Sequence, residues 1–251
     1  MNTSIQDSFN LGWKLALTTK SLASPRLLDS YSAERLPVVA KLLQLTKELL
    51  QKTVDLDPHI DAPKEDSPFY RGMELYQLDV NCRGSPIVVD RLDKETYKTG
   101  KRLRAGDRAP DAPGVVPLTA GLRPGTTNLF DIFSSDKQTA LVFVKDGEDA
   151  KPYLDLLKHY PPEVVLPVIV LQQGDERKAD VFEKTNVVRD SAGYIWKNYP
   201  TENGAKIAIV RPDGCVGALG LSPDVVEEYR NLVFGTPTTL PAASQLEGVG
   251  L

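Results

Sequence analysis

The spacing of apolar residues over the first 55 positions predicts helices. Residues 10–17 read N-L-G-W-K-L-A-L, a mostly apolar segment that suits a helix buried on more than one side. Ser24 and Pro25 combine an N-cap residue with a proline at the first helical position, which is a helix start signal. Apolar residues then recur at helical spacing over positions 27–50. Because Pro37 removes a backbone hydrogen bond and clashes with the preceding turn, we expect two helices at an angle there.

The next segment, residues 55–105, is predicted to be a connector. Residues 55–68 are rich in Asp and Pro, which is typical of an exposed loop. Residues 73–80 and 87–89 have strand character, and we expect the basic stretch 94–104 to be solvated.

Residues 106–235 predict a compact α/β unit. Two buried strands are each followed by a predicted helix, at residues 140–144, 149–160, 164–171 and 175–184. A β-hairpin follows, with strands at 207–210 and 215–218 around the turn R-P-D-G, and Ser222-Pro223 then opens a last helix that reaches about residue 232. Two βα steps, a hairpin and a closing helix are the order of a thioredoxin-like fold. Residues 236–251 have few large apolar side chains, so we expect a loose tail.

Composition excludes several classes of function. The net charge of -4 provides no basic stripe for nucleic acid, and no apolar run is long enough to span a membrane. The opening residues lack a charged-then-apolar signal pattern, so we expect a cytoplasmic protein. Cys82 and Cys215 are too few for a disulfide framework or a zinc site, and we expect no metal. With two histidines and no G-x-S-x-G motif, a hydrolase is disfavoured.

Four motifs resemble those of the phenol hydroxylase-like, FAD-dependent aromatic monooxygenases. The opening M-N-T-S-I-Q-D-S-F-N-L-G-W-K-L-A resembles the last flavin-binding segment of that family. The stretch S-P-x-L-L-D-x-Y-x-A-E-R-x-P at 24–37 also fits, as do A-G-D-R-A-P-D at 105–111 and V-R-P-D-G at 210–214. The resemblance implies an α/β protein with a helical remnant of a flavin monooxygenase domain at 1–104, a thioredoxin-like domain without C-x-x-C at 105–235, and the tail at 236–251.

The resemblance also implies a vestigial flavin-binding segment. In the family, backbone amides at a helix N-terminus meet the pyrimidine edge of the flavin, and Met1, Asn2 and Thr3 hold that position here. Ser4 stands where glycine is usual, and no G-x-G-x-x-G turn for the pyrophosphate occurs in the chain. We therefore expect no bound cofactor, with FAD held only if another chain completes the site. Without C-x-x-C, and with Cys215 expected to be a small buried residue, the second domain is predicted to be redox-silent.

Five side chains are weak candidates for catalysis. His59 stands between two nearby aspartates that would raise its pKa, although an exposed loop histidine is the more frequent explanation of such a residue. Tyr70, Arg71 and Tyr76 could grip a phenolic ligand, but aromatic residues at strand spacing are more often core. Asp7 could act as a general base beside the flavin cleft, or cap or pair within its own helix.

Three functions remain open. The first, slightly favoured because the substrate-side connector persists, is a shortened homologue that binds an aromatic or polyketide-like molecule for a non-redox step of secondary metabolism, such as cyclisation or isomerisation. The second is a non-catalytic accessory or dimerisation module of a full-length monooxygenase. The third is a C-terminal fragment of an aromatic hydroxylase. In each case we expect no hydroxylation by the chain alone, and association with a second copy or a partner monooxygenase through an exposed apolar surface.

Overall fold

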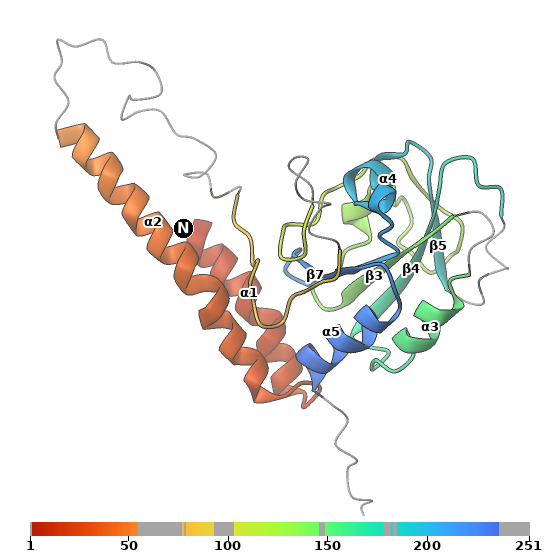
Figure 1. The fold of residues 1–251 in the computed structure, drawn as a ribbon, viewed down its shortest axis with the longest axis horizontal. Helices are drawn as coiled ribbons and strands as arrows, with labels where there is room; N and C mark the ends of the chain where they lie inside the picture. The colour runs from red at the N-terminus through yellow and green to blue at the C-terminus, as the bar shows by residue number, and fades with distance from the viewer. Residues whose placement is uncertain are drawn as a thin grey trace, which may run out of the picture.

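A helical arm precedes an α/β body in the computed structural model, which describes residues 2–54, 77, 79–92, 103–145, 149–177, 182 and 185–235 (Figure 1). The helical arm consists of α1 (Asn2–Thr19), the 3-10 turn η1 (Pro25–Leu28) and α2 (Asp29–Val54). The helices α1 and α2 pack against each other, and α2 projects away from the body.

The predicted helix start at Ser24 is confirmed, but the predicted break at Pro37 is not. Ser24 caps η1, where its side chain accepts a hydrogen bond from the amide of Arg26. The expected break at Pro37 is wrong, because α2 continues through it. A proline inside a helix costs about 3 kcal/mol. Here Glu34 and Arg35, in the turn before Pro37, are held by ion pairs to other elements, which keeps that turn helical.

A seven-stranded mixed sheet forms the centre of the body, in the order β1-β7-β6-β3-β4-β5-β2. The central strand β3 pairs parallel with β4 and antiparallel with β6. The strands are β1 (Val89–Asp90), β2 (Val115–Pro117), β3 (Gln138–Val144), β4 (Val165–Leu171), β5 (Asn186–Asp190), β6 (Ile207–Val210) and β7 (Val216–Gly220). Further helices of the described residues are η3 (Leu129–Asp131), α3 (Lys151–Leu157), α4 (Tyr194–Asn198), η5 (Thr201–Asn203) and α5 (Asp224–Phe234).

Both faces of the sheet are covered, because successive side chains of a strand point to opposite faces. In β3, Ala140 and Val142 contribute to the core beneath α3 and α5, whereas Leu141 and Phe143 contribute to the core on the α4 side. The helical arm joins the first core through Trp13 and two leucines, Leu17 and Leu27. One continuous core therefore spans both sides of residue 104, and the predicted division into segments stays an interpretation.

The mixed α/β fold class is confirmed. The two buried parallel strands, the hairpin and the last helix occur where the sequence predicts them. Residue 215 is an exception, because β7 begins at Val216. The strands β2 and β5 and the helix α4 were not predicted, and residues 175–177 of the second predicted helix are not helical. The name thioredoxin-like remains an interpretation, and the predicted tail, residues 236–251, lies outside the described residues.

Candidate functional site

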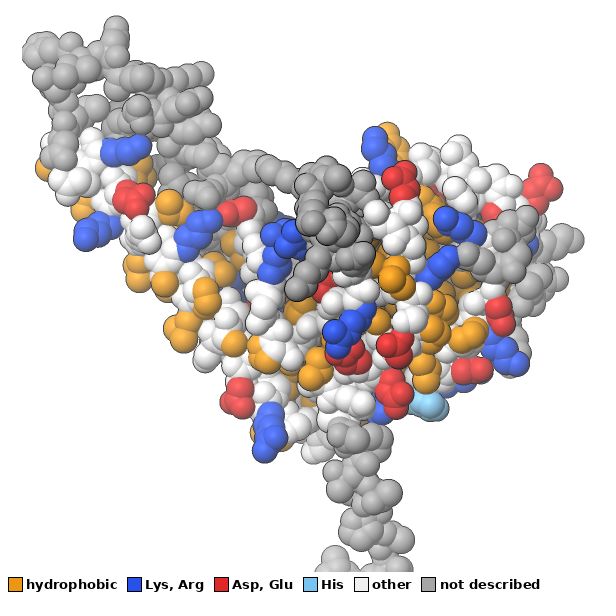
Figure 2. Space-filling model, viewed as in Figure 1, with side chains coloured by type: hydrophobic (Ala, Val, Ile, Leu, Met, Phe, Trp, Pro, Cys, Tyr) orange, Lys and Arg blue, Asp and Glu red, His pale blue; other side chains and the backbone are white. Residues whose placement is uncertain are grey.

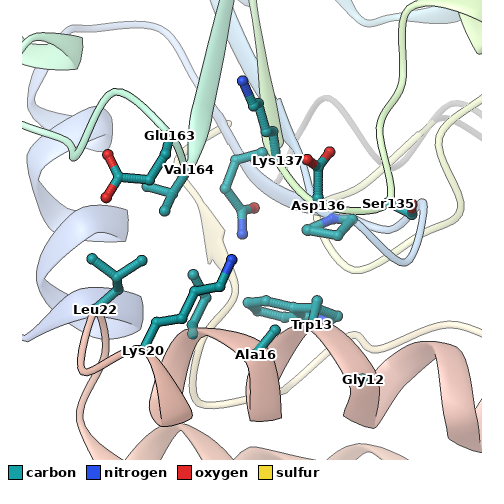
Figure 3. A pocket seen from close by; sticks show the side chains of 13 residues that line it. Gly12, Trp13, Ala16, Lys20, Leu22, Ser135, Asp136, Lys137, Glu163 and Val164 are labelled. Carbon is teal, nitrogen blue, oxygen red and sulfur yellow. The ribbon is translucent and has the colours of Figure 1, made fainter.

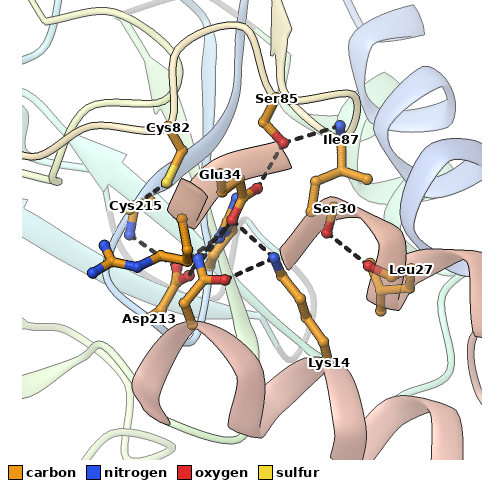
Figure 4. Close-up of polar contacts among 12 residues, drawn as sticks. Lys14, Leu27, Ser30, Glu34, Cys82, Ser85, Ile87, Asp213 and Cys215 are labelled. Carbon is orange, nitrogen blue, oxygen red and sulfur yellow. Dashed lines mark hydrogen bonds and ion pairs between the residues drawn. The ribbon is translucent and has the colours of Figure 1, made fainter. Parts of the chain in front are cut away.

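Three of the sequence motifs meet in one buried cluster between the helical arm and the hairpin (Figure 4). Lys14 comes from α1, Glu34 from α2, and Arg211 and Asp213 from the turn between β6 and β7. We call these four residues the ion cluster. The side chains of Lys14, Glu34 and Arg211 are 0% exposed.

Glu34 is the centre of the ion cluster. Arg211 donates one hydrogen bond to each of its oxygens, from Nη1 to Oε1 at 2.7 Å and from Nη2 to Oε2 at 2.9 Å. Lys14 Nζ lies 2.8 Å from Oε2, and Asn10 Nδ2 donates to the same oxygen at 2.6 Å. Ser85 Oγ donates to Oε1 at 2.6 Å. Both carboxylate oxygens are therefore satisfied without water.

Asp213 supplies the second anion and completes the charge balance. Its Oδ1 accepts from Arg211 Nε at 3.0 Å, and its Oδ2 accepts from Trp13 Nε1 at 3.2 Å. The guanidinium of Arg211 also lies over the indole of Trp13, with Cζ 5.2 Å from the ring centroid. Two cations and two anions are thus buried together, which is the arrangement that offsets the desolvation of each.

The two partners of the Lys14–Glu34 pair respond differently to burial. Burial by itself raises the pKa of Glu34, but the charge and hydrogen bonds of Arg211, followed by Lys14, outweigh it and hold that pKa well below its usual range. The pKa of Lys14 is lowered, first by burial and then by the nearby charge of Arg211. The Glu34–Arg211 pair therefore anchors the ion cluster, and Lys14 is its weaker member. Because its charges are buried and paired with one another, the ion cluster is suited to holding helices and strands in place and not to catalysis.

The predicted flavin-binding segment lies at the N-terminus of α1, where the first N–H groups of a helix have no partner within it. No acidic side chain occupies the first turn, so the helix dipole there is not neutralised. Thr3 Oγ1 accepts a hydrogen bond from Gln77 Nε2 at 2.7 Å, and Ser4 is helical and exposed. Met1 and the side chain of Asn2 lie outside the described residues. A helix N-terminus without an acidic side chain is compatible with the electron-rich edge of a flavin ring, whereas the sequence contains no G-x-G-x-x-G turn for the pyrophosphate of FAD.

Only one of the five catalytic candidates is among the described residues. Asp7 Oδ1 accepts from Arg35 Nε at 2.6 Å, so its carboxylate is paired across the two helices rather than within its own helix. His59, Tyr70, Arg71 and Tyr76 lie outside the described residues. Within the described residues, no group of three or more His, Cys, Asp and Glu side chains is placed to hold a metal ion.

Two pockets flank α1. The first, of about 260 Å³, lies between α1 and the body, and Figure 3 shows Ala16 and Lys20 on one side with Lys137 and Glu163 opposite. The second, which we call the α1 pocket, has about 280 Å³ and is lined by residues that include Phe9. Ligand pockets of enzymes usually measure about 300–1,000 Å³, so each of these could take a single ring at most.

The ion cluster was not predicted from the sequence, although all four of its residues lie in the motifs given above. The one local signal is Lys14, a charged residue inside an apolar helical segment. Such a residue is fully buried only when it is paired, which predicts a buried anion without identifying Glu34.

In the part of the chain that the structure describes, no helix combines the length and hydrophobicity needed to cross a membrane.

Comparison with known proteins places these features in context. Residues 1–46 match the family model described as "FAD binding domain". The chain is 32% identical to a flavin-dependent monooxygenase of Mycobacteroides abscessus, over 91% of this chain and 35% of that protein. It is 30% identical to pentachlorophenol 4-monooxygenase of Sphingobium chlorophenolicum, over 87% of this chain and 38% of that protein. The chain thus spans little more than a third of these relatives.

A solved structure agrees with the sequence relatives. The rebeccamycin biosynthetic enzyme RebC with reduced flavin superimposes with a TM-score of 0.60 at 25% identity, covering 94% of this chain and 42% of that one.

Proposed function

Since this chain belongs to the family of FAD-binding monooxygenases, we propose that it supplies the flavin-edge helix and the C-terminal α/β body of an aromatic monooxygenase of secondary metabolism. In this proposal it does not hydroxylate alone, because the nucleotide-binding residues come from another polypeptide segment. The observation that carries the proposal is the ion cluster, which locks α1 onto the body and so positions its N-terminal turn.

Rigid placement of that turn is what the proposed role requires. A helix N-terminus can bind the edge of a flavin ring only when it stays within about 0.5 Å of the productive geometry. Helices and strands hold a binding group in place more precisely than loops do. Asn10 and Lys14 lie two to three turns from the start of α1, and both are bonded to Glu34 of α2. Arg35 bonds to Asp7 still nearer that start. The first turns of α1 are therefore anchored to α2 from two points.

The helical arm also presents an apolar surface that suits a packing partner. Leu36, Leu43 and Leu50 recur every seven residues along α2 and are 67%, 66% and 64% exposed. We call them the leucine stripe. On α1, Ile5 and Phe9 are also more than half exposed. Figure 2 shows hydrophobic side chains along the outer edge of the arm. Exposed apolar surface of this extent is typical of an interface, which supports a nucleotide-binding domain packed against the arm.

The proposal predicts that flavin binding needs both this chain and the nucleotide-binding domain. We expect the chain, incubated with excess FAD and desalted, to show no flavin absorbance near ~450 nm. The part of the Sphingobium relative outside the matched region, joined to this chain, should retain at least tenfold more flavin than that part alone. The absorbance after desalting measures the flavin that each of these proteins retains. Flavin retained by the chain alone would contradict the first statement, and a folded fusion with no gain over the single part would contradict the second.

A double substitution tests the leucine stripe. We expect Leu43→Ser with Leu50→Ser to change the free energy of unfolding by no more than about 0.5 kcal/mol per site, because both side chains are exposed. The same change should weaken binding of the separate nucleotide-binding part of the Sphingobium relative at least tenfold, measured by calorimetry. Phe130→Ser, which removes a 51% exposed aromatic ring on η3, is the matched control and should bind like the unaltered chain.

Two outcomes would contradict the assignment of the leucine stripe. Unchanged binding by the double variant would remove the stripe from the interface. Sedimentation of the unaltered chain as a dimer that the double variant abolishes would assign the stripe to a second copy instead.

A second candidate function is a non-redox conversion of an aromatic ligand. The α1 pocket favours it, because the pocket combines the apolar Ile5 and Phe9 with the cationic Arg35, which would suit one phenolic ring. Product formed by the flavin-free chain, at a rate unaffected by NADPH, would distinguish this function from the first.

A further inference from the structure

The two cysteines of the chain lie against each other. Cys82 belongs to the segment before β1, and Cys215 follows the turn between β6 and β7. Although 133 positions separate them, their Sγ atoms are 3.8 Å apart (Figure 4). Both are free thiols, and the sequence contains no other cysteine. Spacing along the chain could not predict this contact.

The backbone around the cysteines imposes their contact. The amide of Cys82 donates to the carbonyl of Gly106 at 2.6 Å, and the amide of Gly106 donates to the carbonyl of Val216 at 2.7 Å. Arg108 forms an antiparallel bridge with Cys215. Three segments that are distant in sequence are thus hydrogen-bonded in a layer, which holds the two sulfurs together without a covalent bond.

The two cysteines are accessible from the α1 pocket, and their thiols differ in pKa. Both cysteines line the α1 pocket of about 280 Å³, whereas a water-sized molecule needs only about 30 Å³. The hydrogen bond with Cys215, together with the charge of Arg211, lowers the pKa of the Cys82 thiol. The same hydrogen bond, followed by burial, raises the pKa of Cys215. Cys82 is therefore the more acidic thiol of the pair.

From the 3.8 Å contact and its place in the α1 pocket, we propose that Cys82 and Cys215 form a dithiol site that a hydroperoxide oxidises to an intramolecular disulfide. The Cys82 thiolate attacks one peroxide oxygen, so an S–O bond forms as the O–O bond breaks, and the departing hydroxide takes a proton to become water. Cys215 then loses its proton and attacks the Cys82 sulfur, and the S–O bond breaks to release hydroxide, which that proton converts to water. Two thiols and one hydrogen peroxide give one disulfide and two waters.

The bond would join two parts of the molecule that now touch without covalent linkage. Cys82 precedes β1, the edge strand that pairs with β7, and Cys215 immediately precedes β7. Oxidation would therefore add a covalent link between the segment from Asp79 to Leu92 and the hairpin beside the ion cluster, where the reduced chain has non-covalent contacts alone. The redox state of one pair thus sets how firmly the segment before β1 is held.

Thiol counting on the purified, reduced chain tests this proposal. One equivalent of hydrogen peroxide at neutral pH should remove both thiols, lower the intact mass by about 2 Da and leave the chain monomeric on a non-reducing gel. Dithiothreitol should restore both thiols. The reaction should run at least tenfold faster in the folded chain than in the same chain unfolded by urea, because only the fold pairs the sulfurs. Equal rates, or disulfides only between chains, would overturn the proposal.

Single variants separate the two roles. With Cys215→Ser, peroxide should leave a sulfenic acid on Cys82 that dimedone traps, whereas with Cys82→Ser the thiol of Cys215 should persist under the same exposure. Phenylarsine oxide, which needs two adjacent thiols, should bind the unaltered chain and neither variant. Circular dichroism of each reduced variant establishes that it is folded. A folded Cys215→Ser chain that yields no dimedone adduct, or an unaltered chain that ignores phenylarsine oxide, would refute the assignment.

Discussion

Replacing Glu34 with glutamine is expected to lower the free energy of unfolding by about 3–5 kcal/mol, as measured by urea denaturation followed by circular dichroism. Glutamine keeps the shape of the side chain but removes its charge. Arg211 and Lys14, both 0% exposed, would then be buried with Asp213 as their remaining anion. The loss of an anion that two buried cations share has a large effect because the uncompensated charges stay away from water.

Two other substitutions serve as controls for Glu34→Gln. Lys14→Met should cost no more than about 1–2 kcal/mol, because Arg211 continues to bind both oxygens of Glu34 and an apolar side chain replaces a buried cation of lowered pKa. Asp155→Asn breaks a surface pair with Lys158 and should cause no measurable loss. If Lys14→Met were as destabilising as Glu34→Gln, Lys14 rather than Arg211 would be the main partner of the carboxylate.

The loss of unfolding free energy caused by Glu34→Gln should become smaller as the pH falls. The pKa of Glu34 in the folded chain lies below that of the unfolded chain, which is about 4.3 for a glutamate. The stability that Glu34 contributes is therefore complete above the unfolded pKa and is lost as the pH falls toward the folded one. The difference in unfolding free energy between the unaltered chain and the variant should shrink between pH 7 and pH ~3. A constant difference would contradict the charged role of Glu34.

Gly106→Ala should destabilise the chain by about 4 kcal/mol, combining backbone strain with overpacking. Gly106 has a φ of +91°, a conformation that residues with a Cβ rarely adopt. An added Cβ would lie 2.5 Å from the backbone nitrogen of Arg83 and 2.8 Å from the carbonyl carbon of Cys82. The hydrogen bond from the Cys82 amide to the Gly106 carbonyl, at 2.6 Å, prevents these atoms from moving away. Urea denaturation measures the loss.

Gly214→Ala is the matched control for Gly106→Ala. Gly214 has a similar φ of +78°, but an added Cβ there would meet no atom within 4 Å. Only the strain remains, so the loss should be about 1–2 kcal/mol. Equal losses at the two positions would show that the contact between Cys82 and Gly106 is not tight. The same comparison bears on the cysteine pair, because Gly106 links the backbones that hold the two sulfurs.

The sequence by itself determined the elements whose signals are local. The strands β3 and β4 contain the continuous apolar runs 140–144 and 165–171, which are typical of strands buried on both faces. The R-P-D-G turn specifies the hairpin because proline and glycine occupy positions that require their backbone preferences. Ser24 caps its helix for an equally local reason. The opening motif indicated the family for the same reason, because its residues are contiguous.

The tertiary structure alone decided what depends on residues distant in sequence. Glu34 meets Lys14 across 20 positions and Arg211 across 177, and no local pattern specifies such partners. The same contacts explain why α2 continues through Pro37, where the local rule predicts a break. The sulfur contact of Cys82 with Cys215 likewise exists only because three segments share one hydrogen-bonded layer. Pairing energies become large when burial excludes water, and burial is a property of the assembled chain.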